Sequence, residues 1–383
     1  MNGLEAVRVF LDPRHEQVAS EVAAFGRERL ADGDPDTDTE SRIRARNLVK
    51  ELGEAGLFAH AARQDLRACV LAREGLAYWS PLADAVFALQ ALGSQPMRLV
   101  AERNGSEAEG PWAHWLAAAD RGDAMCGFAM TEPDAGSDAG AIATVARQVG
   151  DVWVLDGTKT LISNAGIADV YVVFASTDPG RGAKGLSAFL VPADAPGFAF
   201  DGPQVMSAPH PLGTLRFEGC RIPADHLLGE AGRGLALGLA TLDRLRATVA
   251  AAACGMAMRA LDEAVAHVKQ RRQFGKPLAE FQLTQDRIAR MATELTAARL
   301  LTYRAAWAKD GGAERVTLES AMAKSYATEA AQRIVDDAVQ LVGGRAVLAH
   351  HPLDRLYRAV RALRIYEGTT EIQRLLIAGQ LLA

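Results

Sequence analysis

The segment Asp169-Val-Tyr-Val-Val-Phe174 decides the fold, because it is short, rich in β-branched and aromatic residues, and surrounded by turn-forming residues. Such a run predicts a β-strand. Three comparable runs lie nearby, at Asp151–Leu155, Gly185–Val191 and Gly213–Phe217. Residues 126–232 are therefore predicted to form a central β domain, antiparallel and barrel-like.

The apolar residues return to a helical period on both sides of this region. Residues 1–125 predict an N-terminal helical domain built from several short helices. Residues 233–383 predict a C-terminal bundle of longer helices. The clearest helical segments there are 233–271, 284–309 and 317–341. The fold class is thus α+β with three domains.

Composition excludes several classes of protein. The chain has 383 residues, of which 49% are hydrophobic and 23% charged, and this balance is typical of globular proteins rather than disordered ones. The net charge is −5 and no long basic run occurs. We therefore expect small molecules or proteins as partners, and neither nucleic acid nor a membrane.

The cysteines and histidines predict no metal centre. The 4 cysteines lack CxxC spacing and the 8 histidines form no HxxxH or HExxH pattern, so neither a disulfide framework nor a metal site is expected. Residues 1–17 lack the apolar core of a signal peptide, and the nearly apolar stretch 247–258 is too short to span a bilayer. These features predict a cytoplasmic protein.

The segment Phe128-Ala-Met-Thr-Glu-Pro-Asp-Ala-Gly-Ser-Asp138 is a polar loop between two structured regions. Its small and polar residues would let the backbone approach a ligand. The same residues are ordinary turn formers, so a surface turn is the alternative. The loop is neither a GxGxxG fingerprint nor a P-loop.

The segment Arg271-Arg-Gln-Phe-Gly-Lys276 places three cations and an aromatic residue at a helix boundary. The Arg271 guanidinium is suited to bind a phosphate-bearing cofactor through two hydrogen bonds. Alternatively, the cations interact favourably with the dipole at the end of the preceding helix. The residues alone leave both interpretations open.

The segment Leu363-Arg-Ile-Tyr-Glu-Gly-Thr-Thr-Glu-Ile-Gln373 holds a candidate catalytic acid, Glu367, beside the flexible Gly368. Thr370 and Gln373 predict a capping box that opens the last helix. Apolar neighbours would raise the pKa of the Glu367 carboxyl and make it a stronger base. A solvated loop acid is the alternative.

Taken together, these segments resemble the acyl-CoA dehydrogenase family of flavoproteins. The resemblance covers about residues 9–383, and its motifs occur in the family's order. They are Phe128–Ser137, Lys159-Thr-Leu-Ile-Ser-Asn164, Arg271–Gly275, Gln340-Leu-Val-Gly-Gly344 and Tyr366-Glu-Gly-Thr369. The fold that this family implies, an N-terminal helical domain, a central β-domain and a C-terminal four-helix domain, agrees with the division predicted above.

The resemblance implies FAD-dependent dehydrogenation of an acyl-CoA thioester to the 2-enoyl-CoA. Glu367 is the implied base, removing the α-proton while the β-hydrogen leaves as hydride to flavin N5. The charge on the thioester oxygen is implied to be stabilised by the backbone N–H of the base and a ribityl hydroxyl. Some members carry the base on an earlier helix, but that position is Leu245 here, which cannot accept a proton.

The resemblance also implies binding residues, oligomeric state and electron acceptor. The residues implied to contact flavin within the subunit are Phe128, Met130, Thr131, Ser163, Thr369 and Glu371. Those implied to reach the FAD of a neighbouring subunit are Arg271, Gln273, Phe274, Gln282, Gln340, Gly343 and Gly344. Those implied to contact acyl-CoA are Ser137, Asp243, Arg246 and Gly368. The active form is then at least a dimer, expected as a homotetramer, and an electron-transfer flavoprotein is the implied acceptor.

Two positions depart from the family pattern. Leu161 occupies a place where many members have an aromatic residue beside the flavin, and Ala346 stands where a glycine is usual after Gly343 and Gly344. Leu161 leaves open an acyl-CoA oxidase or a flavin monooxygenase that uses O₂ on the same scaffold. A non-catalytic acyl-CoA-binding scaffold is a third possibility, against which the presence of Glu367 and the complete Arg271–Gly275 motif argue.

Overall fold

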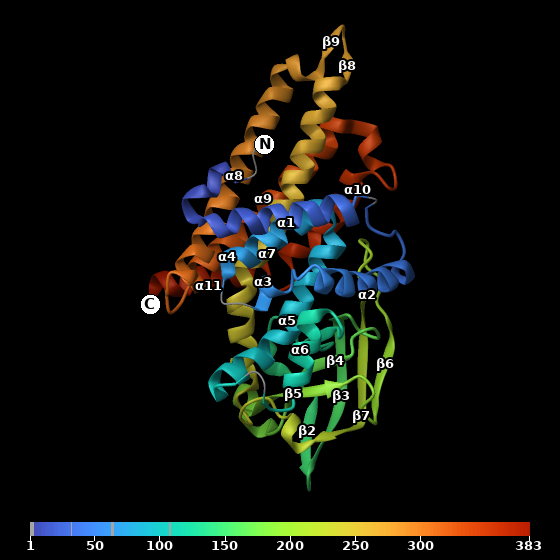
Figure 1. Ribbon diagram of the computed structural model, residues 1–383, viewed down its shortest axis with the longest axis vertical. Helices are drawn as coiled ribbons and strands as arrows, with labels where there is room; N and C mark the ends of the chain where they lie inside the picture. The colour runs from blue at the N-terminus through green and yellow to red at the C-terminus, as the bar shows by residue number, and fades with distance from the viewer. Residues whose placement is uncertain (1–3, 32, 63–64, 107–108) are drawn as a thin grey trace. The chain divides into compact units, whose positions relative to one another are not determined.

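Helices precede and follow a central sheet along the chain, as the sequence predicts, in the computed structural model (Figure 1). The structure describes residues 4–31, 33–62, 65–106 and 109–383. The α+β fold class is therefore confirmed. No helix in the described ranges is both long and apolar enough to cross a membrane.

The elements before the sheet are helices of differing length. They are η1 (Glu5–Phe10), α1 (Pro13–Arg29), α2 (Asp38–Glu54), α3 (Ala59–Ala62), α4 (Leu66–Trp79), α5 (Pro81–Asn104) and α6 (Ala113–Arg121). The strands are β1 (Cys126–Ala129), β2 (Val145–Val149), β3 (Val152–Ser163), β4 (Val170–Ser176), β5 (Leu186–Pro192), β6 (Phe198–Pro203) and β7 (Leu212–Pro223), with the short turns η2 (Ala139–Ala141), η3 (Pro179–Gly185) and η4 (Ala224–His226).

The elements after the sheet are dominated by three long helices, whose bounds agree with the predicted segments to within about two residues. They are α7 (Gly234–Gln270), α8 (Gln282–Asp310) and α9 (Thr317–Val342). The hairpin β8 (Arg272–Gln273) and β9 (Lys276–Pro277) and the turn η5 (Leu278–Glu280) separate α7 from α8 (Figure 1). The chain ends with η6 (Gly343–Val347), α10 (Pro352–Val360), η7 (Arg361–Arg364) and α11 (Thr370–Leu382).

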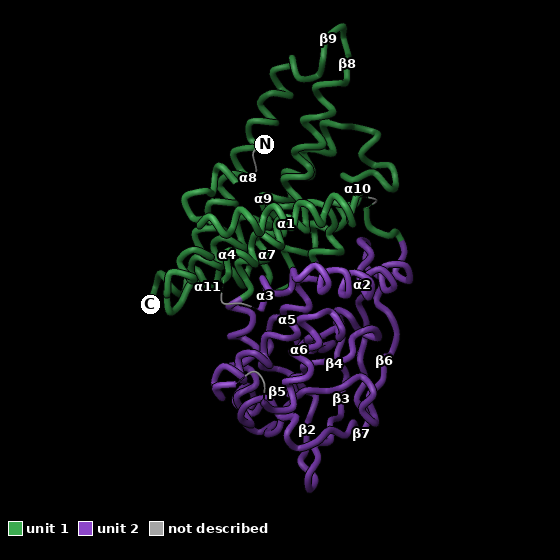
Figure 2. The backbone as a smooth tube through the Cα atoms, in the orientation of Figure 1, with its two compact units in different colours: residues 1–36, 63–84, 245–383 green, residues 37–62, 85–244 purple. Residues whose placement is uncertain are grey.

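The chain forms two compact units that are not continuous in sequence (Figure 2). Unit 1 consists of residues 1–36, 63–84 and 245–383, and unit 2 of residues 37–62 and 85–244. These units follow spatial compactness rather than the predicted three-domain division of the sequence. That division stays a prediction.

Unit 2 contains a seven-stranded sheet in the order β1-β4-β2-β3-β7-β6, with β5 paired to β4. The β3–β7 and β4–β5 pairs are antiparallel, as predicted, whereas β1 runs parallel to β4 with Cys126 opposite Val170. Alternate residues of a strand face the same side, and on β4 these are Val170, Val172 and Phe174. They share a buried core with residues of α5 and α6, namely Met97, Val100 and Leu116.

Unit 1 brings helices unusually close together where α4 faces α7. The residues 247–254 of α7 are all buried, and most are alanine. A Cβ on Gly255 would lie 2.1 Å from the backbone oxygen of Glu74, so only glycine allows this approach. Small side chains on α7 thus place the polar residues of α4 inside the unit.

Candidate active site

Glu367 lies in a tight turn of unit 1 between η7 and α11. Its φ is +54° and that of Gly368 is +88°, so two consecutive residues adopt the left-handed conformation. For a residue with a side chain this conformation costs roughly 1–2 kcal/mol. Hydrogen bonds hold the turn: the Gln373 amide donates to the carbonyl oxygens of Gly368 at 3.0 Å and Glu367 at 3.3 Å.

The predicted capping box of Thr370 and Gln373 is wrong by one residue. Thr369 is the N-cap of α11, and its hydroxyl accepts a hydrogen bond from the backbone N–H of Ile372 at 3.3 Å. The Thr370 hydroxyl donates instead to Glu329 at 2.9 Å. The Gln373 side chain does not take part in capping, because its amide donates hydrogen bonds to the carbonyl oxygens of Glu367 and Gly368.

The Glu367 carboxylate points into the protein. Its Oε2 atom is buried and has no hydrogen-bond partner in the part of the chain that the structure describes. Burial raises the pKa of the Glu367 carboxyl, and this effect outweighs the opposing influence of Arg73, Lys324 and Arg246. A buried carboxylate oxygen with an unused acceptor position is suited to take a proton from a bound molecule.

Two of the three buried cations that act on this carboxyl lie on α4 and α9. Arg73 of α4 donates through Nε and Nη2 to Asp84 at 2.8 and 2.9 Å, and through Nη1 to the Thr248 hydroxyl at 2.9 Å. Lys324 of α9 is fully buried, and its Nζ donates to the Gly368 carbonyl at 2.6 Å. Sequence reasoning missed Arg73, Asp84 and Lys324. The only signal was a charged residue at an apolar position of each helix.

The predicted flavin-contacting residues of unit 2 lie on two stretches that are hydrogen-bonded to each other. Phe128 belongs to β1, and Met130 and Thr131 follow it, whereas Ser163 ends β3. The Thr160 N–H donates to the Thr131 carbonyl at 3.0 Å and joins the two stretches. The structure thus brings these four residues into one region.

Two polar residues support this region, and one of them is fully buried. Lys159, which is fully buried, bonds Glu132 at 2.7 Å and the Met130 carbonyl at 3.1 Å, and burial lowers its pKa to about 8. His210 Nε2 lies 2.9 Å from the Ser163 hydroxyl oxygen. Burial, with nearby Arg42, lowers the pKa of His210 to about 4, so its ring is neutral at physiological pH. Sequence reasoning did not identify His210.

Leu161 is 55% exposed and has a φ of +54°. It falls at an irregularity in the β3–β7 pairing, between Lys159 and Ile162, where its N–H is held by the Gln204 side chain at 2.8 Å. The side chain that departs from the family pattern is therefore presented at the surface of unit 2. Ala346, the other departure, is buried in η6.

The residues implied to reach a neighbouring subunit lie on the surface of unit 1. Phe274, on the β8–β9 hairpin, is 92% exposed. The others are exposed as well: Arg271, Gln273, Gln282, Gln340, Gly343 and Gly344. Burial, followed by Arg345 and Arg271, lowers the pKa of His267. Arg271 begins the Arg271–Gly275 motif, and Arg345 directly follows Gly344 of the Gln340–Gly344 motif.

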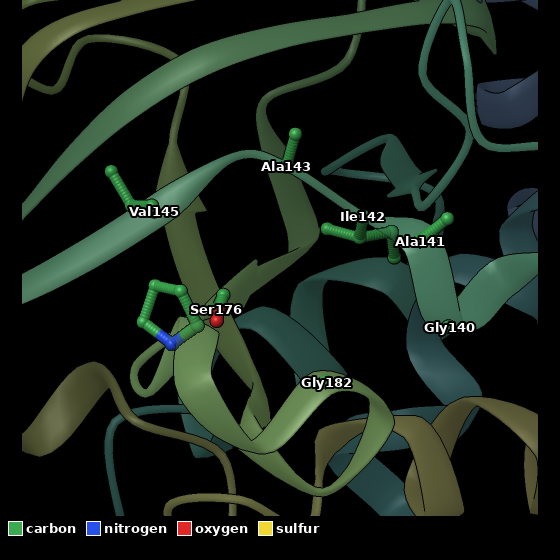
Figure 3. A pocket seen from close by; sticks show the side chains of 8 residues that line it. Gly140, Ala141, Ile142, Ala143, Val145, Ser176 and Gly182 are labelled. Carbon is green, nitrogen blue, oxygen red and sulfur yellow. The ribbon is translucent and has the colours of Figure 1, made fainter.

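The implied acyl-CoA contacts are distributed over several elements. Asp243 and Arg246 both belong to α7, and Arg246 is 7% exposed and influences the pKa of Glu367. Ser137 is exposed in the loop after β1. Beyond this loop, a cavity of about 250 Å³ lies between the η2–β2 segment and η3 (Figure 3). It is lined by small and apolar residues and contains none of the predicted site residues.

Comparisons with known proteins identify the family. Residues 127–220 match the middle domain and residues 232–382 the C-terminal domain of the acyl-CoA dehydrogenases. The mouse mitochondrial short-chain specific acyl-CoA dehydrogenase is 43% identical over 345 residues, covering 87% of this chain and 82% of that protein.

Solved structures agree with this assignment. Butyryl-CoA dehydrogenase from Megasphaera elsdenii superposes with a TM-score of 0.89 at 32% identity, covering 97% of this chain and 99% of that one. A glutaryl-CoA dehydrogenase from Mycobacterium smegmatis, solved in complex with FADH2, gives a TM-score of 0.84 at 30% identity, covering 98% and 96%. The chain belongs to the acyl-CoA dehydrogenase family of enzymes.

Proposed function

We propose that this enzyme dehydrogenates an acyl-CoA thioester at the α,β bond, with Glu367 as the base that removes the α-proton. The observation that carries the proposal is the buried, unpartnered Oε2 of Glu367 among the described residues, in the Tyr-Glu-Gly-Thr motif. The raised pKa of Glu367 strengthens it as a base. Its backbone N–H is proposed to stabilise the negative charge on the thioester oxygen.

FAD is the proposed cofactor, and the residues in place fit it. The joined stretches of unit 2 offer hydroxyls from Thr131 and Ser163, which suit the hydrogen-bonding edge of a planar ring system, whereas the Phe128 ring packs against Phe174. Thr369 and Glu371 are the proposed contacts from unit 1. When bound, FAD would supply the hydride acceptor, at its N5 atom. The chain's own residues orient the ring and hold the base.

A flavin-reduction screen with acyl-CoA thioesters tests the proposal directly. Purified enzyme is mixed anaerobically with thioesters of increasing chain length, and loss of the flavin absorbance is followed. At least one acyl-CoA is expected to reduce the flavin and to yield the 2-enoyl product. Colourless protein that cannot be reconstituted with FAD would instead support a non-catalytic acyl-CoA-binding scaffold.

An electron-transfer flavoprotein is the proposed acceptor, and O₂ is the second candidate. The second candidate rests on Leu161, which is aliphatic and 55% exposed where many members have an aromatic residue. After anaerobic reduction with the product-like ligand bound, slow reoxidation in air is expected. Rapid reoxidation with that ligand still in place would favour an oxidase.

Replacing Arg271 with alanine is expected to release FAD and to promote dissociation on dilution, because we propose that Arg271 and Gln340 reach the FAD of a neighbouring subunit in a dimer or homotetramer. A ligand that binds only the assembled form stabilises it. Flavin content and sedimentation velocity check this, with Arg290→Ala as an exposed control on α8. A stable monomer that holds stoichiometric FAD would refute it.

Replacing Arg246 with alanine is expected to weaken binding of every full-length acyl-CoA, whatever its acyl chain. We propose that Asp243 and Arg246, three residues apart on α7, contact the CoA portion, since such spacing places them on one face. Binding energy from this remote portion also positions the reacting carbons, so turnover falls as well.

Kinetics with paired full and truncated thioesters separate this role from a structural one. A thioester lacking the nucleotide should keep its binding affinity in Arg246→Ala, whereas the change in the pKa of Glu367 on loss of this cation is common to both substrates. The control is Arg259→Ala, which removes another α7 arginine that pairs with Glu263 at 2.8 Å. An equal loss of binding affinity for both substrates would count against CoA recognition.

A further inference from the structure

We infer that Lys324 is a positioning residue for the reaction, holding the turn that carries Glu367 in its catalytic conformation. This inference rests on the proposed role of Glu367 as the base. Lys324 belongs to α9, whereas the turn lies between η7 and α11. The link between them is the hydrogen bond of 2.6 Å from Lys324 Nζ to the Gly368 carbonyl oxygen.

The turn needs such a support because its backbone is strained. Glu367 and Gly368 both have positive φ, and a glutamate in this region persists only when its surroundings hold it there. The Gly368 carbonyl receives hydrogen bonds from two directions, from Lys324 of α9 and from Gln373 of α11. The direction of the Gly368 carbonyl fixes the orientation of the peptide group that joins Gly368 to Thr369.

The energetic cost of burying Lys324 points to a role beyond packing. Its side chain is fully buried, and a buried ammonium is expensive unless carboxylates or carbonyl groups compensate it. Burial lowers the pKa of Lys324 to about 8, while Glu367 acts in the opposite direction. The charge of Lys324 and the charge of the base therefore stabilise each other.

The charged groups that act most strongly on the base come from four helices. Those acting on Glu367 are Arg73 of α4, Asp84 of α5, Arg246 of α7 and Lys324 of α9. Those acting on Lys324 are Glu367, Arg246, Glu329 and Glu371. Lys324 both acts on the charge of Glu367 and bonds the turn itself. Its removal thus changes both the charge near the base and the geometry of the base.

Replacing Lys324 with methionine separates these effects from simple packing, because methionine keeps an unbranched stem without the ammonium. We expect kcat for flavin reduction to fall about 10²-fold through misplacement of the base. Loss of a neighbouring cation also raises the pKa of Glu367, so the acid limb of the pH profile should move to higher pH. A purely structural role would lower the rate without moving this limb.

Two variants serve as comparisons. Lys324→Gln retains a donor without the charge, so part of kcat should return while the acid limb stays shifted. Thr328→Val removes a buried hydroxyl one turn further along α9, where it donates to the Lys324 carbonyl at 2.9 Å. This control should leave both kcat and the acid limb unchanged.

Hydrogen exchange of the peptide 363–373 provides a readout that does not depend on turnover. Exchange in this peptide should be faster in Lys324→Met than in the wild-type enzyme or in Thr328→Val. If no acyl-CoA reduces the wild-type flavin, the proposed function fails, and the exchange result still tests the positioning role. If the wild-type enzyme is active and both Lys324 variants show its acid limb and its exchange rates, the inference is overturned.

Discussion

Replacing Glu367 with glutamine is expected to reduce turnover by about 10²- to 10⁴-fold while FAD stays bound, because the amide keeps the shape of the side chain but cannot accept the α-proton. Stopped-flow flavin reduction measures the loss, and the absorbance of the purified protein reports flavin content. No acid at position 245 can take over the role, since it is leucine. Unchanged turnover would exclude Glu367 as the base.

The same variant is expected to be more stable than the wild-type protein near neutral pH. Burial raises the pKa of Glu367 above its ordinary value of 4.5 in the folded state. The folded protein therefore holds this proton more tightly than the unfolded chain, and stability is lost as pH rises above 4.5. Thermal unfolding at several pH values should show the gap between Glu367→Gln and the wild type widening as pH increases.

Replacing Asp84 with asparagine is expected to lower the free energy of unfolding by about 3–5 kcal/mol, because it leaves the buried Arg73 guanidinium without its counter-ion. The side chains of both residues are 2% exposed, and the pair meets at 2.8 Å. Urea unfolding measures the change. The double variant Arg73→Met with Asp84→Leu removes both charges and should recover most of the loss. Equal losses in both variants would assign the effect to packing.

Asp84→Asn should also shift the pKa of Glu367, in the direction opposite to the shift expected in Lys324→Met. Asp84 raises the pKa of Glu367, whereas Arg73 lowers it. Without the Asp84 charge, the acid limb of flavin reduction should move to lower pH in the fraction of enzyme that remains folded. An upward shift would contradict this account of the electrostatics.

The strongly periodic elements of the fold could be predicted from the sequence. The four β-branched runs became β3, β4, β5 and β7, and the long apolar periods became α7, α8 and α9. Strands β1, β2 and β6 were missed. They are short, and most residues of β2 and β6 face solvent, so they lack the alternating pattern that predicts a strand.

The candidate site was predictable only where its residues fall in contiguous motifs. Glu367 and the Phe128–Thr131 stretch could be named from sequence, but their roles remain proposals. Arg73 and Lys324 could not be named, because a charged residue in a helix is normally solvent-exposed. Their burial arises from helices that are distant in sequence and come together only in the folded unit. The N-cap was predicted one residue too late, at Thr370 instead of Thr369, because either of these adjacent threonines could cap the helix.

Unit 1 is built from three separate stretches of the sequence, and this has a consequence for how the protein folds during synthesis. Glu74 of α4 accepts hydrogen bonds from Arg299 and Tyr303 of α8, each at 2.6 Å in the shortest contact. The ribosome synthesises Glu74 long before Arg299 and Tyr303. The Glu74 carboxylate therefore cannot be buried with its partners until α8 has been made. A fragment of residues 245–383 made alone would bury Arg299 without its counter-ion. Domains usually fold in order from the N-terminus as they emerge, but this unit can close only after residues 245–383 have been synthesised.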